Sequence, residues 1–305
     1  MSEIGIIIVT YNSAAEIGAC LDAAAASGAE TVVVDNASQD DTVAEVARRG
    51  VRLIANPENR GFAGGVNQGF RELKNRYVLL LNPDVVIQSS LEPLRLACDL
   101  PGSAGAGGQL VDAWGRAQAG FMVRQLPTAA TLALEALLLN RIWRGNPVNR
   151  RYRCLGQDHS ARSAVEQPAG AFFMVRRAVW EELGGFDESF YPLWFEDVDF
   201  CRRVRDRGLS LYYVPDAVAK HTGGHSLVRM PLEMRLIYWY RGLLRYSSKH
   251  FGPFAFRVVW LAVVTGSILR GIAESALHRS FKPMAAYGKV AGLAGRSLFS
   301  GLRAT

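Results

Sequence analysis

Short apolar runs alternate with helix-like stretches through the first hundred residues of the chain. The runs are IGIIIV at 4–9, TVVVD at 31–35, VRLI at 51–54 and YVLLL at 77–81. The stretches that follow them predict helices near 14–26, after the polar residues 38–41, near 63–75 and near 89–99. Continuous apolar strands separated by helices indicate an α/β fold with a mostly parallel central sheet covered on both faces. Ligands of such folds bind at the carboxyl ends of the strands.

The pattern becomes less regular after residue 100. It predicts a hairpin near 105–123, a helix near 128–140, a basic loop near 141–162, a buried strand at 169–175, a helix near 198–207 and a strand in LSLYYV. Two helical stretches follow, about 231–249 and 254–278, in which tyrosine and tryptophan alternate with arginine and lysine. We therefore predict two domains, residues 1–228 and a helical C-terminal extension of residues 229–305.

Charge separates these two parts of the chain. The net charge is +7, and from Arg229 onward twelve Lys/Arg face only Glu233 and Glu274, which gives +10 and leaves −3 for residues 1–228. Only twelve residues lie between Arg257 and Arg270, fewer than the roughly 20 that span a bilayer. The tail therefore favours an aromatic, basic helix at an anionic membrane surface, and a helix docked on the core with a solvated basic face is the open alternative. No nucleic-acid reading motif is present, so nucleic acid is not an expected partner.

Two further features indicate where the chain works. The four cysteines have neither disulfide nor zinc spacing, as in a reduced compartment. The N-terminal apolar run lacks the basic segment and cleavage site of a signal peptide, so we interpret it as a strand. A cytoplasmic location is expected.

Polar residues gather at the predicted strand ends, in TYN at 10–12, DNAS at 35–38, NPENRGFAGG at 56–65 and NPD at 82–84. Pro83 stops its strand and presents Asp84 just beyond the sheet edge. A carboxylate there can hold Mg²⁺ or Mn²⁺, although Asn-Pro-Asp is also good turn chemistry. Asp35 suits a nucleobase N–H or a ribose hydroxyl, or the cap of the next helix. The glycines that follow Arg60 let backbone approach a phosphate before a helix start.

YPLWFEDVDF, residues 191–200, places three carboxylates among aromatic residues. Acids suit a helix start, where they meet free N–H groups and the positive end of the helix dipole. At about 100° per residue, Glu196 and Asp199 share one face and Asp197 lies about 160° from Asp199. We therefore assign Asp199 to the helix dipole and Glu196 to the loop or to acceptor hydroxyls, and leave Asp197 facing a pocket walled by Trp194 and Phe195.

These motifs together resemble glycosyltransferase family 2, which has the GT-A fold, and within it the rhamnosyltransferase-like branch. The resemblance rests on VTYNS, DNASQDDT, NRGFAGGVNQG, LLLNPDVVI, the stretch from GAFFMV to LYYVP, and KHTGGHS, and it covers about residues 4–226. It implies an inverting transfer of a sugar from a nucleotide-diphosphate donor to an acceptor hydroxyl. It also implies a lipid-linked or polysaccharide acceptor in cell-surface glycan synthesis, with the enzyme at the cytoplasmic face of the inner membrane.

The resemblance also implies roles for individual residues. Asp197 matches the general base, and Asp84 matches the last acid of the family's DxD metal motif, in which Asn82 replaces the first acid. His221 matches a histidine that completes the metal or diphosphate site, a role for which His225 competes. Acceptor binding falls to Trp194, Phe195 and Glu196. Donor-binding positions are Thr10, Tyr11, Asn12, Asp35, Asn59, Arg60, Gly61, Asn67, Asn82 and Asp84.

Several alternatives stay open at this point. The branch's usual donor, dTDP-rhamnose, is our expectation, with UDP-hexose or UDP-galactofuranose as the alternatives. Arg176 and Arg177 are alternative supports for the diphosphate. A sugar-nucleotide-binding protein without catalysis is a further reading, which Asn82 favours and the intact FEDVD opposes.

Overall fold

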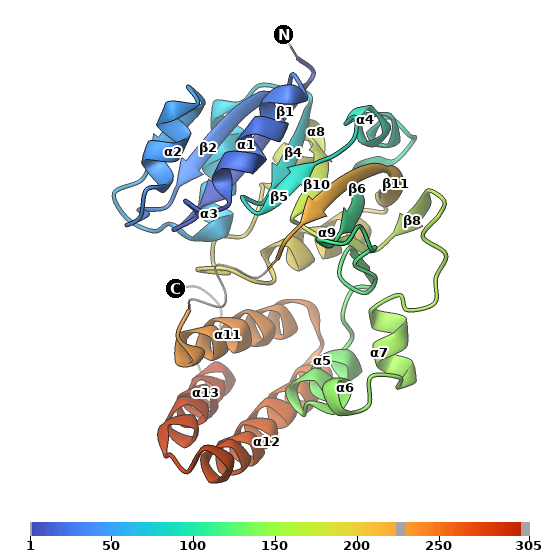
Figure 1. Cartoon of the computed structure of the whole chain (residues 1–305). Helices are drawn as coiled ribbons and strands as arrows, with labels where there is room; N and C mark the ends of the chain where they lie inside the picture. Colours follow the sequence, from blue (N-terminus) through green and yellow to red (C-terminus); the bar gives the residue numbers. More distant parts are fainter. Residues whose placement is uncertain (1, 224–229, 300–305) are drawn as a thin grey trace. The chain divides into compact units, whose positions relative to one another are not determined.

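The computed structural model describes residues 2–223 and 230–299 (Figure 1). The chain forms two compact units that are not contiguous in sequence. Unit 1 contains residues 1–126, 153–188 and 196–226, and unit 2 contains residues 127–152, 189–195 and 227–305. The second unit thus includes two earlier segments that the sequence pattern assigned to domain 1–228.

A nine-stranded sheet forms the centre of unit 1, in the order β3-β2-β1-β4-β10-β6-β11-β5, with β8 beside β11. Strands β1–β4, β6 and β11 run one way, and β5, β8 and β10 run the other way. The predicted α/β class with a mostly parallel sheet is confirmed. The strands are β1 (Ile4–Thr10), β2 (Glu30–Asp35), β3 (Arg52–Ala55), β4 (Tyr77–Leu81), β5 (Val85–Ile87), β6 (Ser103–Val111), β8 (Ser163–Val165), β10 (Phe172–Arg176) and β11 (Ser210–His221). A separate pair, β7 (Val123–Arg124) and β9 (Gln167–Pro168), lies outside this sheet.

Helices cover both faces of this sheet because its strands are apolar on both sides. Ile6 and Ile8 share a buried cluster with side chains of α1 (Ile17–Ala26), α2 (Thr42–Arg48) and α4 (Glu92–Cys98). On the other face α3 (Gly61–Glu72) approaches so closely that a Cβ on Gly69 would lie 2.7 Å from the Ile7 side chain. The two faces alternate along β1, as the period of a strand requires.

An aromatic layer fills the α3 face of unit 1. Phe70 of α3 stacks on Trp180 at 3.8 Å between ring centroids, and Trp180 also contacts Phe186 and Phe200. Trp180 belongs to α8 (Arg177–Leu183) and Phe200 to α9 (Glu196–Asp206). This layer fixes the position of α9, whose first turn carries the acidic cluster.

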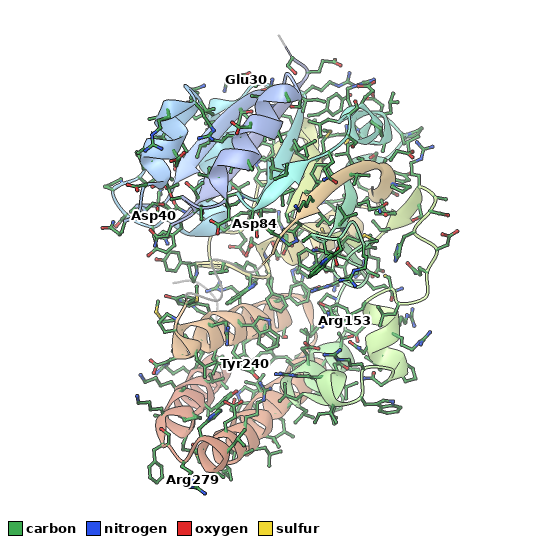
Figure 2. All side chains as sticks on the ribbon, viewed as in Figure 1. Glu30, Asp40, Asp84, Arg153, Tyr240 and Arg279 are labelled. Carbon is green, nitrogen blue, oxygen red and sulfur yellow. The ribbon has the colours of Figure 1, made fainter. Side chains whose placement is uncertain are left out.

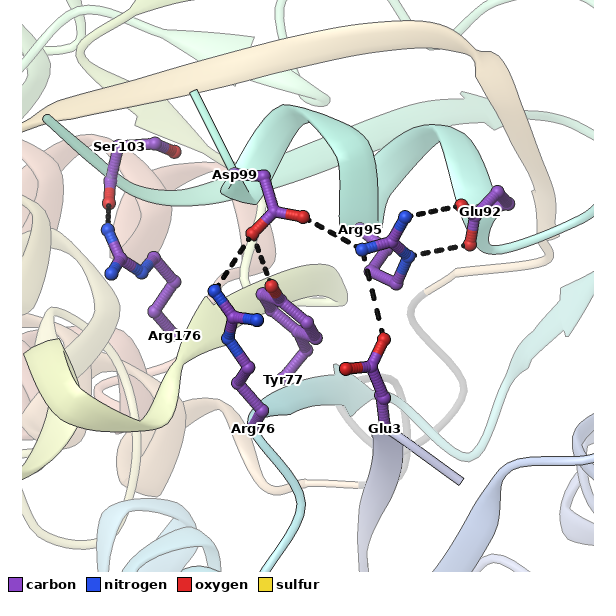
Figure 3. A network of polar contacts seen from close by, with 8 residues as sticks. All are labelled: Glu3, Arg76, Tyr77, Glu92, Arg95, Asp99, Ser103 and Arg176. Carbon is purple, nitrogen blue, oxygen red and sulfur yellow. Dashed lines mark hydrogen bonds and ion pairs between the residues drawn. The ribbon is translucent and has the colours of Figure 1, made fainter. Parts of the chain in front are cut away.

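A polar network ties α4 to the sheet (Figure 3). Asp99 accepts hydrogen bonds from the Tyr77 hydroxyl and from Arg95, and Arg95 also pairs with Glu92 on its own helix. Burial and the hydrogen bond to Asp99 raise the pKa of Tyr77. These groups lie at the start of β4, so the network supports the fold rather than the strand ends where ligands bind.

Glycines make the middle of the sheet unusually tight. A Cβ on Gly105 would meet the carbonyl oxygen of Met174 in β10, and one on Gly107 would meet Pro168. On Gly108 it would meet the ring of Phe172 and the carbonyl of Ala217. Strand β6 therefore has room for no side chain at these three positions.

Helices make up unit 2. They are α5 (Ala129–Ala136), α6 (Leu139–Ile142), α7 (Pro147–Tyr152), α11 (Leu232–His250), α12 (Pro253–His278) and α13 (Lys282–Phe299). Gly266 of α12 lies directly against the carbonyl of Ala136, which also accepts a hydrogen bond from Arg270. The two predicted C-terminal helices are present within two residues of their expected ends, and the pattern missed α13.

Helix α12 corrects one argument from the sequence. Its 26 residues are long and apolar enough to cross a membrane, although 33% of its most apolar stretch is buried in the structure. Arg270, which ends the apolar run counted in the sequence, lies 5.6 Å from the ring centroids of both Tyr240 and Tyr287. Length and composition are therefore compatible with a span, and the core helix of a soluble protein meets the same criteria.

Candidate active site

The first part of the site is the pair Asp84 and His221. Strand β4 ends at Leu81, a turn closes with the Val85 N–H donating to the Asn82 carbonyl, and β5 then pairs antiparallel with β11. Because Val85 lies opposite His221 in that register, Asp84 is brought to the histidine, with 3.6 Å between its Oδ2 and His221 Nε2. Asp84 is labelled in Figure 2. The structure thus brings these two predicted residues together.

Gln118 fixes the orientation of the histidine ring. Its amide nitrogen donates to the His221 carbonyl at 2.9 Å, so its oxygen, 2.9 Å from His221 Nδ1, must accept. His221 Nδ1 therefore carries the proton, and in the neutral ring Nε2 presents a lone pair. Burial lowers the pKa of His221, although the charge of Asp84 opposes the shift, so the neutral ring is favoured at neutral pH.

A neutral Nε2 and a carboxylate oxygen that face each other form a fitting pair of ligands for a cation. Both atoms offer lone pairs and no hydrogen lies between them, which is the arrangement that a divalent cation satisfies. Within residues 2–223 and 230–299, no group of three His, Cys, Asp or Glu side chains is suited to a metal. Mg²⁺ or Mn²⁺ held by Asp84 and His221 would take further ligands from donor phosphate and water.

Phe121 and Arg124 extend this part of the site and were missed in the sequence. The ring of Phe121 stacks on the His221 imidazole at 5.0 Å with only 10° between planes, and the Arg124 guanidinium lies 5.6 Å from the Phe121 ring centroid. Gln118 and Phe121 follow β6 in an irregular segment, and Arg124 lies in the two-residue strand β7. No sequence pattern marks such a segment, because only the folded chain brings it to His221.

The second part of the site is the predicted base, Asp197, in the first turn of α9. A Cβ on Gly170 would lie 3.0 Å from Asp197 Oδ2, so a larger residue at this position would press on the carboxylate. Burial raises the pKa of Asp197, while the backbone N–H of Val198, the charge of Arg124 and the backbone N–H of Gly170 oppose the shift. A carboxylate with a raised pKa is a better proton acceptor than an exposed one. A glycine inside a strand-like run was the available signal for this close approach.

The other two acids of the cluster have different surroundings. Asp199 is fully buried and accepts from Arg203 Nε at 2.8 Å, while the same guanidinium donates to the carbonyls of Leu183 and Gly185. Beyond its predicted position near the helix dipole, Asp199 therefore holds the turn after α8. Glu196 is 6% exposed, and its Oε2 has no hydrogen-bond partner among the described residues. Burial, with the charges of Asp197 and Asp199, raises the pKa of Glu196 well above its ordinary value.

We expect Glu196→Gln to stabilise the protein increasingly as the pH is raised above 4.5, the ordinary pKa of glutamate. Between its ordinary and raised pKa, Glu196 binds more protons in the folded state than in the unfolded state, so wild-type stability falls as pH rises. Glutamine removes this loss. Thermal unfolding of both proteins across this range measures the effect, with exposed Glu58→Gln as the control. A constant difference in melting temperature at all pH values would contradict the prediction.

The predicted nucleotide residues form a third, internally bonded group. Asp35 is 1% exposed, and its carboxylate accepts from the Thr10 hydroxyl and from the backbone and hydroxyl of Ser38. Asn12, with a left-handed φ of 52°, donates its N–H to Ser38 and accepts from the Gln39 N–H. Tyr11 is 45% exposed. Asp35 therefore anchors the loop, and the open aromatic ring of Tyr11 is the surface available to a base.

The Gly-rich segment also contains both an exposed side chain and side chains that are already hydrogen-bonded within the protein. Asn59 accepts from the Gly61 N–H at 2.8 Å, where Gly61 has a φ of 76°, and Arg60 is exposed at the start of α3. Asn67 instead bonds in both directions to the backbone of Phe186 and donates to Glu188. Arg60 thus stays open to solvent, whereas Asn67 holds the turn at 186–188.

Two predicted acceptor residues lie in unit 2. The ring of Phe195 is buried and lies 5.7 Å from Tyr246 and 6.3 Å from Trp239 of α11. Its predicted role as a wall that stacks on sugar is therefore at odds with its packing. Trp194 and Phe195 have φ values of 78° and 75°, a left-handed conformation that costs about 1–3 kcal/mol for each such residue.

Three residues were alternative candidates for the diphosphate or metal site: Arg176, Arg177 and His225. Arg176 donates to the Ser103 carbonyl (Figure 3), and Arg177 donates to the carbonyls of Phe70, Leu73 and Asn75. Both arginines therefore bind backbone and do not support a diphosphate. His225 lies outside the described residues.

We expect Gln118→Leu to lower activity by about 10–100-fold, as is typical when the group orienting a metal-binding histidine is lost. Leucine has a similar volume and can neither accept from Nδ1 nor donate to the carbonyl. Activity titrated with Mn²⁺ should show a raised half-saturation concentration. Gln88→Leu, an exposed residue just after β5, is the control, and an unchanged Mn²⁺ dependence of Gln118→Leu would contradict the prediction.

The fold of this chain is of the GT-A type. The mannosyltransferase PcManGT from Pyrobaculum calidifontis, solved in complex with GDP-Man and Mn²⁺, is 18% identical and has a TM-score of 0.54, with 99% of this chain and 82% of that chain covered. S. aureus TarS in complex with UDP-GlcNAc is 15% identical with a TM-score of 0.56, over 99% of this chain and 83% of that chain. At these identities the likeness shows the fold alone.

The chain belongs to glycosyl transferase family 2, whose family model matches residues 5–184. The predicted family is thereby confirmed, and the protein is a glycosyltransferase that transfers a sugar from a nucleotide-sugar donor. A curated relative from Mycobacterium tuberculosis, N-acetylglucosaminyl-diphospho-decaprenol L-rhamnosyltransferase, is 28% identical over 296 residues. The match covers 90% of this chain and 94% of that relative.

Proposed function

We propose that the protein is an inverting rhamnosyltransferase that uses dTDP-rhamnose and acts on a hydroxyl of a lipid-linked glycan acceptor. The similarity to the M. tuberculosis relative over 90% of the chain supports the sugar and the acceptor class, because that relative's name gives L-rhamnose and a diphospho-decaprenol. The observation that carries the mechanism is the contact of Asp197 with Gly170, which holds one carboxylate of raised pKa against the backbone.

The chemistry is a single displacement. The acceptor hydroxyl oxygen attacks the anomeric carbon, the bond from that carbon to the donor diphosphate breaks, and Asp197 takes the hydroxyl proton. The nucleoside diphosphate leaves with the electron pair, and one displacement inverts the anomeric configuration. We assign the proton to Asp197 because the backbone N–H groups of Val198 and Gly170 and the charge of Arg124 favour its ionised form, although burial raises its pKa.

Asp84 and His221 act on the leaving group. When Mg²⁺ or Mn²⁺ is bound, it supplies positive charge that stabilises the diphosphate. Gln118 keeps the lone pair of His221 Nε2 directed at Asp84, and Phe121 holds the ring plane. Tyr11 and Arg60 are exposed groups suited to the base and the phosphates.

A donor panel tests this proposal. We expect dTDP-rhamnose with Mg²⁺ or Mn²⁺ to raise the melting temperature more than UDP-glucose or UDP-galactofuranose, because bound ligand stabilises the folded state. Transfer to an N-acetylglucosaminyl-diphospho-lipid, with the product anomer assigned by NMR, tests acceptor and inversion. Retention of configuration would overturn the mechanism, and preference for a UDP sugar would overturn the donor.

We further propose that the protein is peripheral at the cytoplasmic face of the inner membrane. Support comes from α12, whose outward side exposes Phe254 (81%), Leu261 (58%), Leu269 (58%) and Ile272 (55%). Deleting residues 229–305 is not a clean test, because α11 and α12 bury Phe195 and contact Ala136. Binding of the whole protein to vesicles containing phosphatidylglycerol, weakened by Leu261→Ser with Leu269→Ser, is the expected result. Absence of vesicle binding would overturn this location.

A further inference from the structure

The segment of residues 138–149 in unit 2, which contains α6 and the start of α7, has polar side chains inside and apolar side chains outside. Its three asparagines, Asn140, Asn146 and Asn149, are only 4%, 3% and 2% exposed. Ile142 and Trp143 are 78% and 64% exposed. This is the reverse of ordinary burial, in which asparagine is mostly exposed and large apolar side chains are mostly buried.

The side chains of the buried asparagines form hydrogen bonds with the backbone of this segment and with each other. Asn146 Nδ2 donates to the Asn140 side chain at 3.1 Å and to the Trp143 carbonyl at 2.7 Å. Asn149 Nδ2 donates to the Arg144 carbonyl at 2.7 Å, and Asn140 Nδ2 donates to Glu135 at 2.8 Å. These bonds hold the backbone on both sides of Ile142 and Trp143. The conformation that exposes these two apolar side chains, the apolar tip of the segment, is therefore fixed by hydrogen bonds.

The charge around this tip has one sign. Residues 137–152 contain four arginines and no aspartate, glutamate or lysine. Arg141 and Arg144 flank Ile142 and Trp143, both are exposed, and neither has an ion pair within residues 2–223 and 230–299. Solvent-exposed arginines without acidic partners complement an anionic surface.

We propose that residues 139–144 are a membrane-docking tip that inserts Ile142 and Trp143 at the headgroup boundary of an anionic bilayer. Tryptophan is favoured at this boundary because its ring is apolar and its N–H is polar. Arg141 and Arg144 reach lipid phosphates from the same tip, with their stems against apolar surface. The tip lies about a hundred residues before the C-terminal helices and gives unit 2 a second membrane contact. This inference rests on the proposed membrane location.

The test uses the full chain and vesicles of phosphatidylcholine with and without phosphatidylglycerol. Ile142→Ser with Trp143→Ser should weaken binding to the anionic vesicles by about tenfold or more, since two large apolar groups no longer leave water. Arg141→Gln with Arg144→Gln should weaken the same binding at low salt and have a smaller effect at high salt. All four side chains are exposed, so melting temperature and transfer to a soluble acceptor should stay unchanged.

A matched control and a site-specific signal make the outcome decisive. Trp114 is 78% exposed at a turn in unit 1, so Trp114→Ser removes an indole at least as exposed as that of Trp143 and should leave vesicle binding unchanged. Brominated lipid should quench the tryptophan fluorescence of the wild type. The extent of this quenching should be smaller in Trp143→Phe and unchanged in Trp114→Phe. Equal binding of wild type and the Ile142/Trp143 variant would overturn the docking tip alone, and equal weakening by Trp114→Ser would also overturn it. Absence of binding by wild type would overturn the membrane location as well, whereas the donor panel judges the transferase function separately.

Discussion

Asp197→Asn should lower kcat by roughly 10²–10⁴-fold, the usual contribution of a positioned general base. Asparagine keeps the shape of the side chain and its contact with Gly170, but it cannot take the acceptor proton. Donor binding should change little, because the predicted donor groups lie in the loops after β1 and β2 and at Asp84. Steady-state transfer rates and the donor-induced shift in melting temperature measure the two quantities separately.

The control for this variant lies on the same helix. Asp206 is at the end of α9, is 47% exposed and pairs with Arg202, so Asp206→Asn removes the same charge away from the site. The wild-type pH profile adds a second readout. Because burial raises the pKa of Asp197, kcat/KM should rise with pH as this carboxyl ionises and then level off. Full turnover by Asp197→Asn, or a loss of equal size in Asp206→Asn, would show that another group accepts the proton.

Asp84→Ala should reduce kcat/KM by roughly 10²–10³-fold, as expected when one stabiliser of transition-state charge is removed. Alanine removes one of the two proposed cation ligands, so the loss should be accompanied by loss of Mn²⁺ dependence. The extra thermal stabilisation that Mn²⁺ gives in the presence of the nucleoside diphosphate should also disappear. Calorimetric titration of Mn²⁺ with the nucleotide present gives a readout independent of turnover.

Asp216→Asn is the matched control, since Asp216 is an exposed acid on β11, the strand that carries His221. It should leave Mn²⁺ binding unchanged. If Asp84→Ala still binds Mn²⁺ with the affinity of the wild type, the cation site lies elsewhere.

Local patterns predicted most of the fold. The alternation of apolar runs and helices located β1–β4 and α1–α4, because each element buries its own periodic face. The pattern missed α13, whose glycines lower its intrinsic helix propensity. It also placed the domain boundary near 228, although residues 127–152 and 189–195 belong with the C-terminal helices. Contacts such as Phe195 with Tyr246 join residues far apart in sequence, and no local pattern encodes them.

The site was predicted unevenly for the same reason. Asp84 and His221 were found through their motifs, and the β5–β11 register explains why they meet. Gln118 has no motif, and its importance appears only when its two hydrogen bonds to His221 are seen. Asp35 and Asn67 were predicted to bind the donor, yet each side chain forms hydrogen bonds within the protein. Residue type at a strand end therefore identifies a candidate ligand-binding residue. The hydrogen bonds that its side chain already makes within the protein decide which of its donors and acceptors are available to a ligand.

The three glycines of β6 also set the limits for re-engineering this enzyme. At positions 105, 107 and 108 every larger residue meets backbone or a packed ring, so mutagenesis there should yield unfolded protein for any substitution. A library aimed at new sugar donors should leave this strand unchanged and place its diversity in the loops around Tyr11, Arg60 and Phe121. The close packing of β6 thus identifies positions 105, 107 and 108 as the ones to leave unchanged in such a library.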